Sequence, residues 1–284
     1  MEQEIIKLAS QILKKDVQVV ERLMGGMSNY TYIIEAEGKK YTFRKPGDKA
    51  ENFVSRTIER KNIDLAESLG ITNHTVYLNL KNGLKIAEYV NGTVLSSMPR
   101  QPHLEAVAKT LKKIHQSGLK AENDYDHLGR LAKYESYNHT LSPRYVELKN
   151  IWLTWFEQYK KLPMVFCHGD AQPSNFIITK YNEALVVDFE FSGNNDPYYD
   201  IAQFGNIDFH DALALLDVYC NHQVTKEDKK RVIFYRMFLT LQWHQVATFK
   251  HEIGLSEKLH IPFDKVAIAY LDKAEALKNM YLEV

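Results

Sequence analysis

The chain has 284 residues and a mass of 33.0 kDa, enough for one large domain or two lobes around a substantial core. Lys plus Arg and Asp plus Glu number 36 each, so no net charge favours nucleic acid or an anionic membrane. The two cysteines exclude a disulfide framework, and no apolar run reaches the roughly 18 residues of a membrane span. Because the first residues are acidic and lack a signal-peptide pattern, we expect a cytoplasmic protein. The balanced charge and the lack of a long apolar run predict that it binds neither nucleic acid nor membranes.

The first ninety residues are dominated by strand patterns. Runs of β-branched and aromatic residues predict three opening strands, over 17–24, 30–36 and 41–44. Apolar spacing, ended by a glycine, then predicts a helix over 52–69. Two further strands, over 75–80 and 84–89, are joined by a hairpin signal at Lys81-Asn82-Gly83. This part is therefore predicted to be a small β-sheet lobe with one helix.

The character of the chain changes after Val90-Asn91-Gly92. Helical periodicity dominates from Leu104 onward and is broken only over 163–194. The polar stretch from Glu122 to Pro143 is predicted to be a long surface connection. The predicted fold class is α+β, with an N-terminal nucleotide-binding lobe over 1–90 and a larger, mainly helical lobe for catalysis and substrate binding over 91–284.

Two short runs carry the chemistry: His168-Gly169-Asp170-Ala171-Gln172-Pro173-Ser174-Asn175 and Val187-Asp188-Phe189-Glu190. An Asp, an Asn five positions later and a second Asp thirteen positions beyond form the layout of a phosphoryl-transfer site. Asp170 is the predicted catalytic residue, which aligns the attacking hydroxyl group. Asn175 and Asp188 are the predicted Mg²⁺ ligands, holding the ion against the phosphates of ATP. A lone Asp in a loop more often caps a turn, but the joint spacing argues against that interpretation.

Glu190, two residues after Asp188, has three possible roles. It would add a metal contact, meet a cationic substrate, or form an ordinary salt bridge.

The nucleotide phosphates are predicted to lie at the first turn, where glycines allow the backbone to approach an anion. Arg44 on the third strand is the candidate cation for the phosphates, and Glu59 on the following helix would hold it by an ion pair. The alternative is that both are solvated surface charges. The predicted nucleotide-binding residues are Gly25, Gly26, Ser28, Asn29, Arg44, Glu59, and the hinge residues Glu88 and Val90, whose backbone would meet adenine.

The chain resembles the choline/ethanolamine kinase family within the aminoglycoside phosphotransferase superfamily, over nearly its whole length. The resemblance rests on Gly25-Gly26-x-x-Asn29, Arg44-Lys45-Pro46-Gly47, Arg56-x-x-Glu59, Glu88-Tyr89-Val90-Asn91-Gly92, Leu111-x-x-x-His115 and the two catalytic runs. It implies a protein-kinase-like, two-lobed fold with ATP and Mg²⁺ as cofactors. The run from Asp188 to Gly193, with Asn195-Asp196-Pro197-x-x-Asp200-Ile201-Ala202, is most similar to bacterial choline kinases. Ala171-Gln172-Pro173-Ser174 departs from that pattern.

The resemblance implies a small-molecule alcohol or amine as acceptor, with choline or a related amino alcohol as the leading candidate. Aromatic faces attract the quaternary ammonium of choline by about 0.5–2 kcal/mol per ring. The candidate substrate residues are Trp243, the preferred ring, with Tyr198, Tyr235 and Glu190. An aminoglycoside, a thiamine-like compound or a sugar is the alternative acceptor, and a catalytically silent nucleotide-binding scaffold is the alternative class of protein. The sequence does not predict the oligomeric state.

Overall fold

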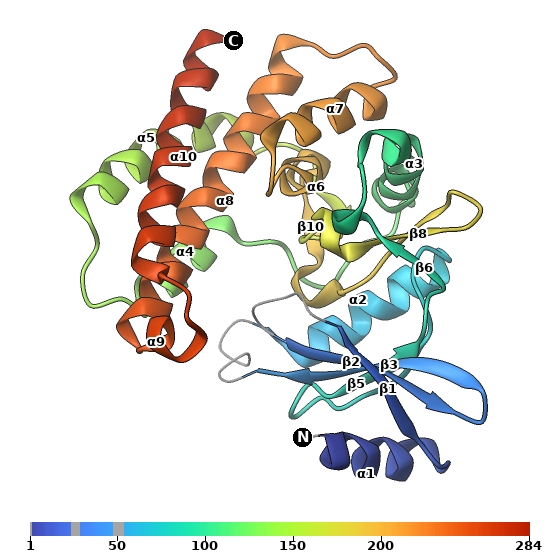
Figure 1. Ribbon diagram of the computed structural model, residues 1–284. Coiled ribbons are helices and arrows are strands. Elements are labelled where there is room, and N and C mark those ends of the chain that lie inside the picture. Colours follow the sequence, from blue (N-terminus) through green and yellow to red (C-terminus); the bar gives the residue numbers. More distant parts are fainter. Residues whose placement is uncertain (1, 24–28, 48–53) are drawn as a thin grey trace. The chain divides into compact units, whose positions relative to one another are not determined.

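The computed structural model describes residues 2–23, 29–47 and 54–284 (Figure 1). The chain forms two compact units. The first comprises Met1–Asn123 and Val165–Asn194, and the second Asp124–Met164 and Asn195–Val284. The catalytic runs therefore belong to the same unit as the N-terminal sheet, whereas the expected lobe boundary near residue 90 stays a prediction.

The first unit is built on a five-stranded antiparallel sheet in the order β1-β2-β3-β5-β4. Its strands are β1 (Gln18–Leu23), β2 (Asn29–Ala36), β3 (Lys39–Pro46), β4 (Thr75–Leu78) and β5 (Lys85–Glu88). Each lies within about two residues of the predicted strand. The expected hairpin between β4 and β5 turns at Gly83, whose φ of 72° is in the region that glycine adopts without strain.

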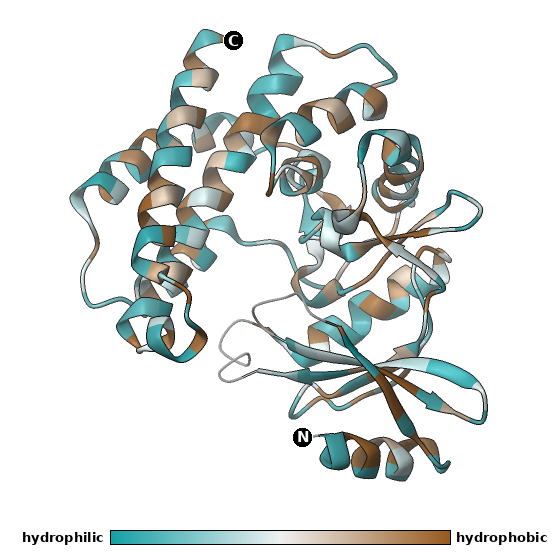
Figure 2. Cartoon of the chain, in the orientation of Figure 1, coloured by the Kyte–Doolittle hydropathy of each residue, from teal (hydrophilic) through white to brown (hydrophobic). Residues whose placement is uncertain are grey.

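Two helices flank this sheet on opposite faces (Figure 1). Helix α1 (Glu2–Leu13), which the sequence analysis missed, packs Ile5 and Ala9 against an apolar face of Tyr32, Phe43 and Ile86. Figure 2 shows the alternation of apolar and polar residues along α1 that this one-sided burial requires. Helix α2 (Arg56–Ser68) is the helix predicted from its periodicity.

The same alternation that buries one face of β3 directs the intervening residues to the side of α2. The rest of this unit comprises β6 (Gly92–Val94), α3 (Leu104–His115), β7 (Val165–Cys167), β8 (Phe176–Thr179), β9 (Ala184–Val186) and the start of β10 (Gly193–Asn195). Strands β6, β8 and β9 form a three-stranded antiparallel sheet, and β8 and β9 make the hairpin between the two catalytic runs.

The second unit is helical. It contains α4 (His127–Glu135), α5 (Pro143–Tyr159), α6 (Pro197–Phe204), α7 (Phe209–Tyr219), α8 (Lys226–Glu252), α9 (Leu255–Leu259) and α10 (Phe263–Glu283). Helix α8 is buried along most of its length and begins at Thr225 with a capping box to Asp228. Among the described helices, none has the length and apolar content that a membrane crossing needs.

One prediction for this unit is wrong: the stretch 122–143 is not a plain surface connection. It contains α4, whose first turn is capped by Asp126, which accepts a hydrogen bond from the Gly129 N–H. The helix buries His127, Leu131 and Tyr134. A His and a Tyr count as polar in a sequence pattern, and the apolar periodicity was therefore hidden.

Candidate active site

The catalytic loop connects β7 to the short helical turn Pro173–Asn175 and holds Asp170 and Asn175 together. The amide nitrogen of Asn175 donates to the Asp170 carboxylate at 2.9 Å and to its backbone carbonyl at 2.8 Å. Gln172 donates to the same Asp170 oxygen at 3.0 Å. Gln172, where the sequence departs from the family pattern, therefore contributes to the orientation of Asp170.

The backbone before Asp170 is braced from the neighbouring turn. His168 Nε2 lies 3.0 Å from the Val187 carbonyl, and its Nδ1 lies 3.2 Å from the Asp170 N–H. Gly169 has a φ of 79°, and a Cβ there would lie 2.2 Å from the Phe191 carbonyl oxygen. Only glycine fits this close approach between the two catalytic runs.

The Asp170 carboxyl group has a higher pKa than an ordinary Asp. Burial is the main cause of the raised pKa of Asp170, and the Asp188 carboxylate adds to it. The hydrogen bonds from Asn175 and Gln172 oppose this rise without cancelling it. Asp170 is therefore poised as a hydrogen-bond acceptor and proton acceptor at higher pH than a solvated Asp.

Asp188 follows β9 at a sharp change of chain direction. Its φ of 73° is left-handed, a conformation that Asp tolerates better than most residues, and the helical turn Phe189–Phe191 starts directly after it. The Val187 N–H donates to the Asn175 carbonyl at 2.9 Å, so the two predicted metal ligands lie on bonded segments. Strand β9 ends at Val186, so Glu190 lies in the helical turn and not on a strand face shared with Asp188.

Arg44 connects the sheet, the helix α2 and Asp188. Its guanidinium donates to Glu59 at 2.7 Å and to Asp188 at 2.9 Å, and the side chains of Arg44 and Glu59 are 6% and 0% exposed. The alternative that these are solvated surface charges is therefore wrong. Burial raises the pKa of Asp188, but Arg44 and Lys85 oppose it and leave that pKa below its ordinary value.

Arg56 is a second buried arginine that the sequence analysis did not assign to the site. It donates to Glu59 at 2.6 Å and to Glu190 at 2.9 Å. Its position three residues before Glu59 on a helix was the available signal. Of the three readings of Glu190, the structure shows the ion pair, together with a 3.5 Å contact from the Asn29 amide. Burial and Asp188 raise the pKa of Glu190.

The site offers the hard oxygen donors that Mg²⁺ prefers. One carboxylate oxygen each from Glu59, Asp188 and Glu190 lie within 4.8 Å of one another. Asn175 uses its amide nitrogen for Asp170, which leaves its amide oxygen for another partner. Arg44 takes only one of the two Asp188 oxygens. The donor set thus fits a divalent cation at Asp188.

The other residues predicted to bind the nucleotide lie at the first turn and at the hinge. Gly25, Gly26 and Ser28 lie outside the described residues, whereas Asn29 starts β2. At the hinge, the Glu88 N–H donates to the His74 carbonyl and its carbonyl accepts from the Asn73 amide. A carbonyl oxygen has room for a second bond, so adenine recognition there stays a prediction. Val90 is buried.

The candidate acceptor rings all belong to the second unit. Tyr235 is 3% exposed and donates to Asp196 at 2.8 Å, in a buried aromatic cluster. Tyr198 donates to Asp228, and the Arg231 guanidinium lies 4.2 Å from its ring centroid. Trp243 is half-buried on α8. The ring of Tyr198 therefore already faces a cation within its own unit.

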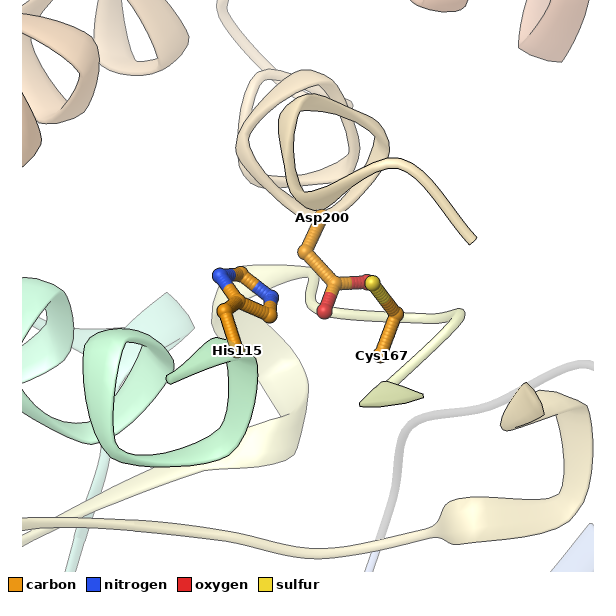
Figure 3. A group of neighbouring side chains, drawn as sticks. All are labelled: His115, Cys167 and Asp200. Atoms are coloured by element: carbon orange, nitrogen blue, oxygen red, sulfur yellow. The ribbon is translucent and has the colours of Figure 1, made fainter. Parts of the chain in front are cut away.

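Two further polar groups of the first unit, His115 and Cys167, are buried near the catalytic loop. Cys167 ends β7 immediately before His168, and His115 ends α3; in this unit their side chains approach to within 4.8 Å (Figure 3). Figure 3 also shows Asp200, a fully buried residue of α6.

Comparison with known proteins agrees with this geometry. The model of the phosphotransferase enzyme family (APH) matches residues 19–232. Protein LicA of Haemophilus influenzae is 27% identical over 250 residues, covering 81% of this chain and 73% of the relative. A crystal structure of LicA in complex with AMP covers 99% of both chains at 22% identity, with a TM-score of 0.78. The choline kinase LicA from Streptococcus pneumoniae has a TM-score of 0.73 at 22% identity, covering 95% of this chain and 98% of that one.

The protein-kinase-like fold is therefore shared with these solved structures. Because the family model spans most of the chain, this chain belongs to the phosphotransferase enzyme family.

Proposed function

We propose that the protein transfers the γ-phosphate of ATP to the hydroxyl group of choline or a closely related amino alcohol. The observation that carries the chemistry is the joint placement of Asp170, Asn175 and Asp188 beside the buried Arg44–Glu59 pair. The choice of acceptor is supported by the likeness to proteins named as choline kinases.

In this proposal each side chain has one task. Asp170 accepts a hydrogen bond from the acceptor hydroxyl, and so aligns its oxygen with the γ-phosphate. Arg44, held by Glu59, neutralises charge on the nucleotide phosphates. The oxygens of Asn175 and Asp188 hold Mg²⁺, which screens the phosphate charge that develops during transfer.

The acceptor ammonium is assigned to the second unit. Trp243 is the principal ring in the proposal, because the Tyr198 ring already contacts the Arg231 guanidinium and Tyr235 is buried. A quaternary ammonium cannot donate a hydrogen bond, so ring faces are its main source of affinity.

A panel of acceptors tests this assignment. ADP release is followed with ATP, Mg²⁺ and, in turn, choline, ethanolamine, thiamine, methylthioribose and kanamycin. We expect turnover with choline or ethanolamine, and turnover slower by about a hundredfold or more in the Asp170→Ala variant. Turnover of kanamycin, thiamine or methylthioribose without choline turnover would replace the acceptor while keeping the reaction class.

Absence of turnover by the wild-type protein with every acceptor, despite ATP binding, would favour the alternative of a nucleotide-binding scaffold.

A further inference from the structure

Lys85 is a buried cation at the active site to which no role has been assigned above. It lies on β5 directly opposite Arg44 on β3, so both side chains project from the same face of the sheet toward α2. Its side chain is 14% exposed. Its nearest carboxylate oxygen is Glu59 Oε1 at 3.9 Å, the limit of an ion pair.

Glu59 does not depend on Lys85 for a partner. Arg44 and Arg56 contact its two oxygens at 2.7 Å and 2.6 Å, and both contacts are far shorter than that to Lys85. The Lys85 ammonium group is therefore the least engaged cation of the cluster, which leaves it available for another anion.

Burying Lys85 in this position is costly. Burial, and then the adjacent Arg44, lower the pKa of the Lys85 ammonium group. Like charges directly opposite each other on a sheet repel, and their repulsion is stronger away from water. A hydrophobic side chain at this position would avoid both costs.

The charges become unbalanced once the site is loaded. Three carboxylates, Glu59, Asp188 and Glu190, face the three cations Arg44, Arg56 and Lys85. When Asp188 engages a divalent cation, fewer carboxylate charges remain to balance these cations. The surplus positive charge beside Arg44 then matches a polyanionic ligand.

We propose that Lys85 is a second phosphate-binding cation, which acts beside Arg44 on the phosphate chain of a nucleoside di- or triphosphate. This assignment rests on the proposed function in one respect only, that Arg44 meets the nucleotide phosphates. It does not depend on which alcohol is the acceptor.

Calorimetric titration with adenosine, AMP, ADP and ATP, with Mg²⁺ present and without acceptor, tests the proposal. We expect Lys85→Met to weaken ADP and ATP binding roughly tenfold while adenosine affinity stays unchanged, because only the charged contact is lost. Lys85→Arg should restore most of the affinity. Lys45→Met is the matched control, since Lys45 lies next to Arg44 on the opposite face and pairs with Glu4.

Thermal unfolding of the nucleotide-free proteins separates this role from a structural one. We expect Lys85→Met to melt at or above the wild-type temperature, because the substitution removes a buried cation whose nearest carboxylate oxygen is 3.9 Å away. A lower melting temperature together with an unchanged ratio of ADP to adenosine affinity would overturn the proposal and make Lys85 a counter-ion of Glu59. Should the Met variant fold poorly, Lys85→Gln serves for the same titrations.

The outcome is independent of the acceptor panel. Wild-type turnover of choline with an unchanged affinity ratio in Lys85→Met would reject only the role of Lys85. A changed ratio with no choline turnover would support that role and reject only the acceptor.

Discussion

At the scale of single residues, Asp170 is oriented by hydrogen bonds from Asn175 and Gln172, and its pKa is raised. Asn175 and Gln172 both donate to one of its oxygens, Oδ2, so the carboxyl group is oriented before any substrate arrives. Pre-orientation of this kind lowers the reorganisation that a reaction needs. The raised pKa of Asp170 adds basicity at the same atoms.

Replacement of Asp170 by Ala tests its role. We expect kcat to fall on the order of 10²- to 10⁴-fold, because the hydroxyl group loses the residue that aligns it. The dissociation constant for ATP should stay within about threefold, since the charges that face the nucleotide remain. Steady-state kinetics and calorimetry give both quantities. Near-normal turnover would remove Asp170 from this role.

The residue at position 188 adopts a left-handed backbone conformation and, in the proposal, supplies an oxygen ligand to Mg²⁺. Asn tolerates the same backbone conformation, so Asp188→Asn should fold like the wild type. We expect Mg²⁺ to tighten ATP binding in the wild type and to have little effect in the variant. Loss of a metal contact worth several kcal/mol should lower kcat on the order of a thousandfold. An Mg²⁺ response equal to that of the wild type would contradict the assignment.

At the scale of elements, short segments position the site and helices support it. Strand β3 carries Arg44, helix α2 carries Glu59, and the turn after β9 carries Asp188; the three meet because Arg44 contacts both acids. In the second unit, α4 contributes His127 to an aromatic cluster with Tyr199, Tyr235 and Phe238.

The burial of His127 predicts acid sensitivity. Burial, and less strongly Arg130, lower the pKa of His127 to about 3. The unfolded chain takes up a proton below about pH 6.5 that the folded protein does not. The free energy of unfolding therefore falls by about 1.4 kcal/mol per pH unit as the pH drops from about 6.5 toward 3, and this contribution is absent above that window.

The variant His127→Phe should lose this sensitivity, because Phe fits an aromatic cluster and has no nitrogen to leave unpaired, as His127 Nε2 is. Urea unfolding at pH 7 and pH 5 measures the change in stability. We expect the loss between the two pH values to be about 2 kcal/mol smaller than in the wild type. The exposed His260, replaced by Asn, is the control. Equal losses in wild type and His127→Phe would show that folded His127 accepts a proton.

At the scale of the whole molecule, the proposed tasks divide between the two units. The described groups assigned to nucleotide, metal and proton chemistry belong to the first unit, and the candidate acceptor rings belong to the second. Affinity for the nucleotide and affinity for the acceptor should therefore respond to different substitutions.

Trp243→Ala tests this division. We expect the KM for choline to rise roughly tenfold, as removal of a cation–π contact implies, and the KM for ATP to stay within about twofold. Trp155→Ala, which removes a ring stacked on Tyr281 elsewhere in the same unit, is the matched control. A choline KM unchanged in Trp243→Ala, or raised as much by the control, would remove Trp243 from the acceptor site.

The reaction class, the five strands of the N-terminal sheet and helix α2 were predicted from the sequence itself, because periodicity and motif spacing are local properties of the chain. Spacing placed Asp170, Asn175 and Asp188 in one motif, and the β8–β9 hairpin accounts for the interval between Asn175 and Asp188. Helix α4 was missed, since its buried face uses His127 and Tyr134.

The Arg44–Glu59 ion pair was predicted from the sequence, but only the tertiary structure showed which other charges meet it. Arg56 and Lys85 stand far from Glu190 and Arg44 in sequence, and their partnership arises from strand register and helix packing. Long-range contacts such as these join segments that no local spacing in the sequence relates to each other. Burial then decides their energetics, because a charge withdrawn from water interacts strongly with its neighbours and a solvated one does not.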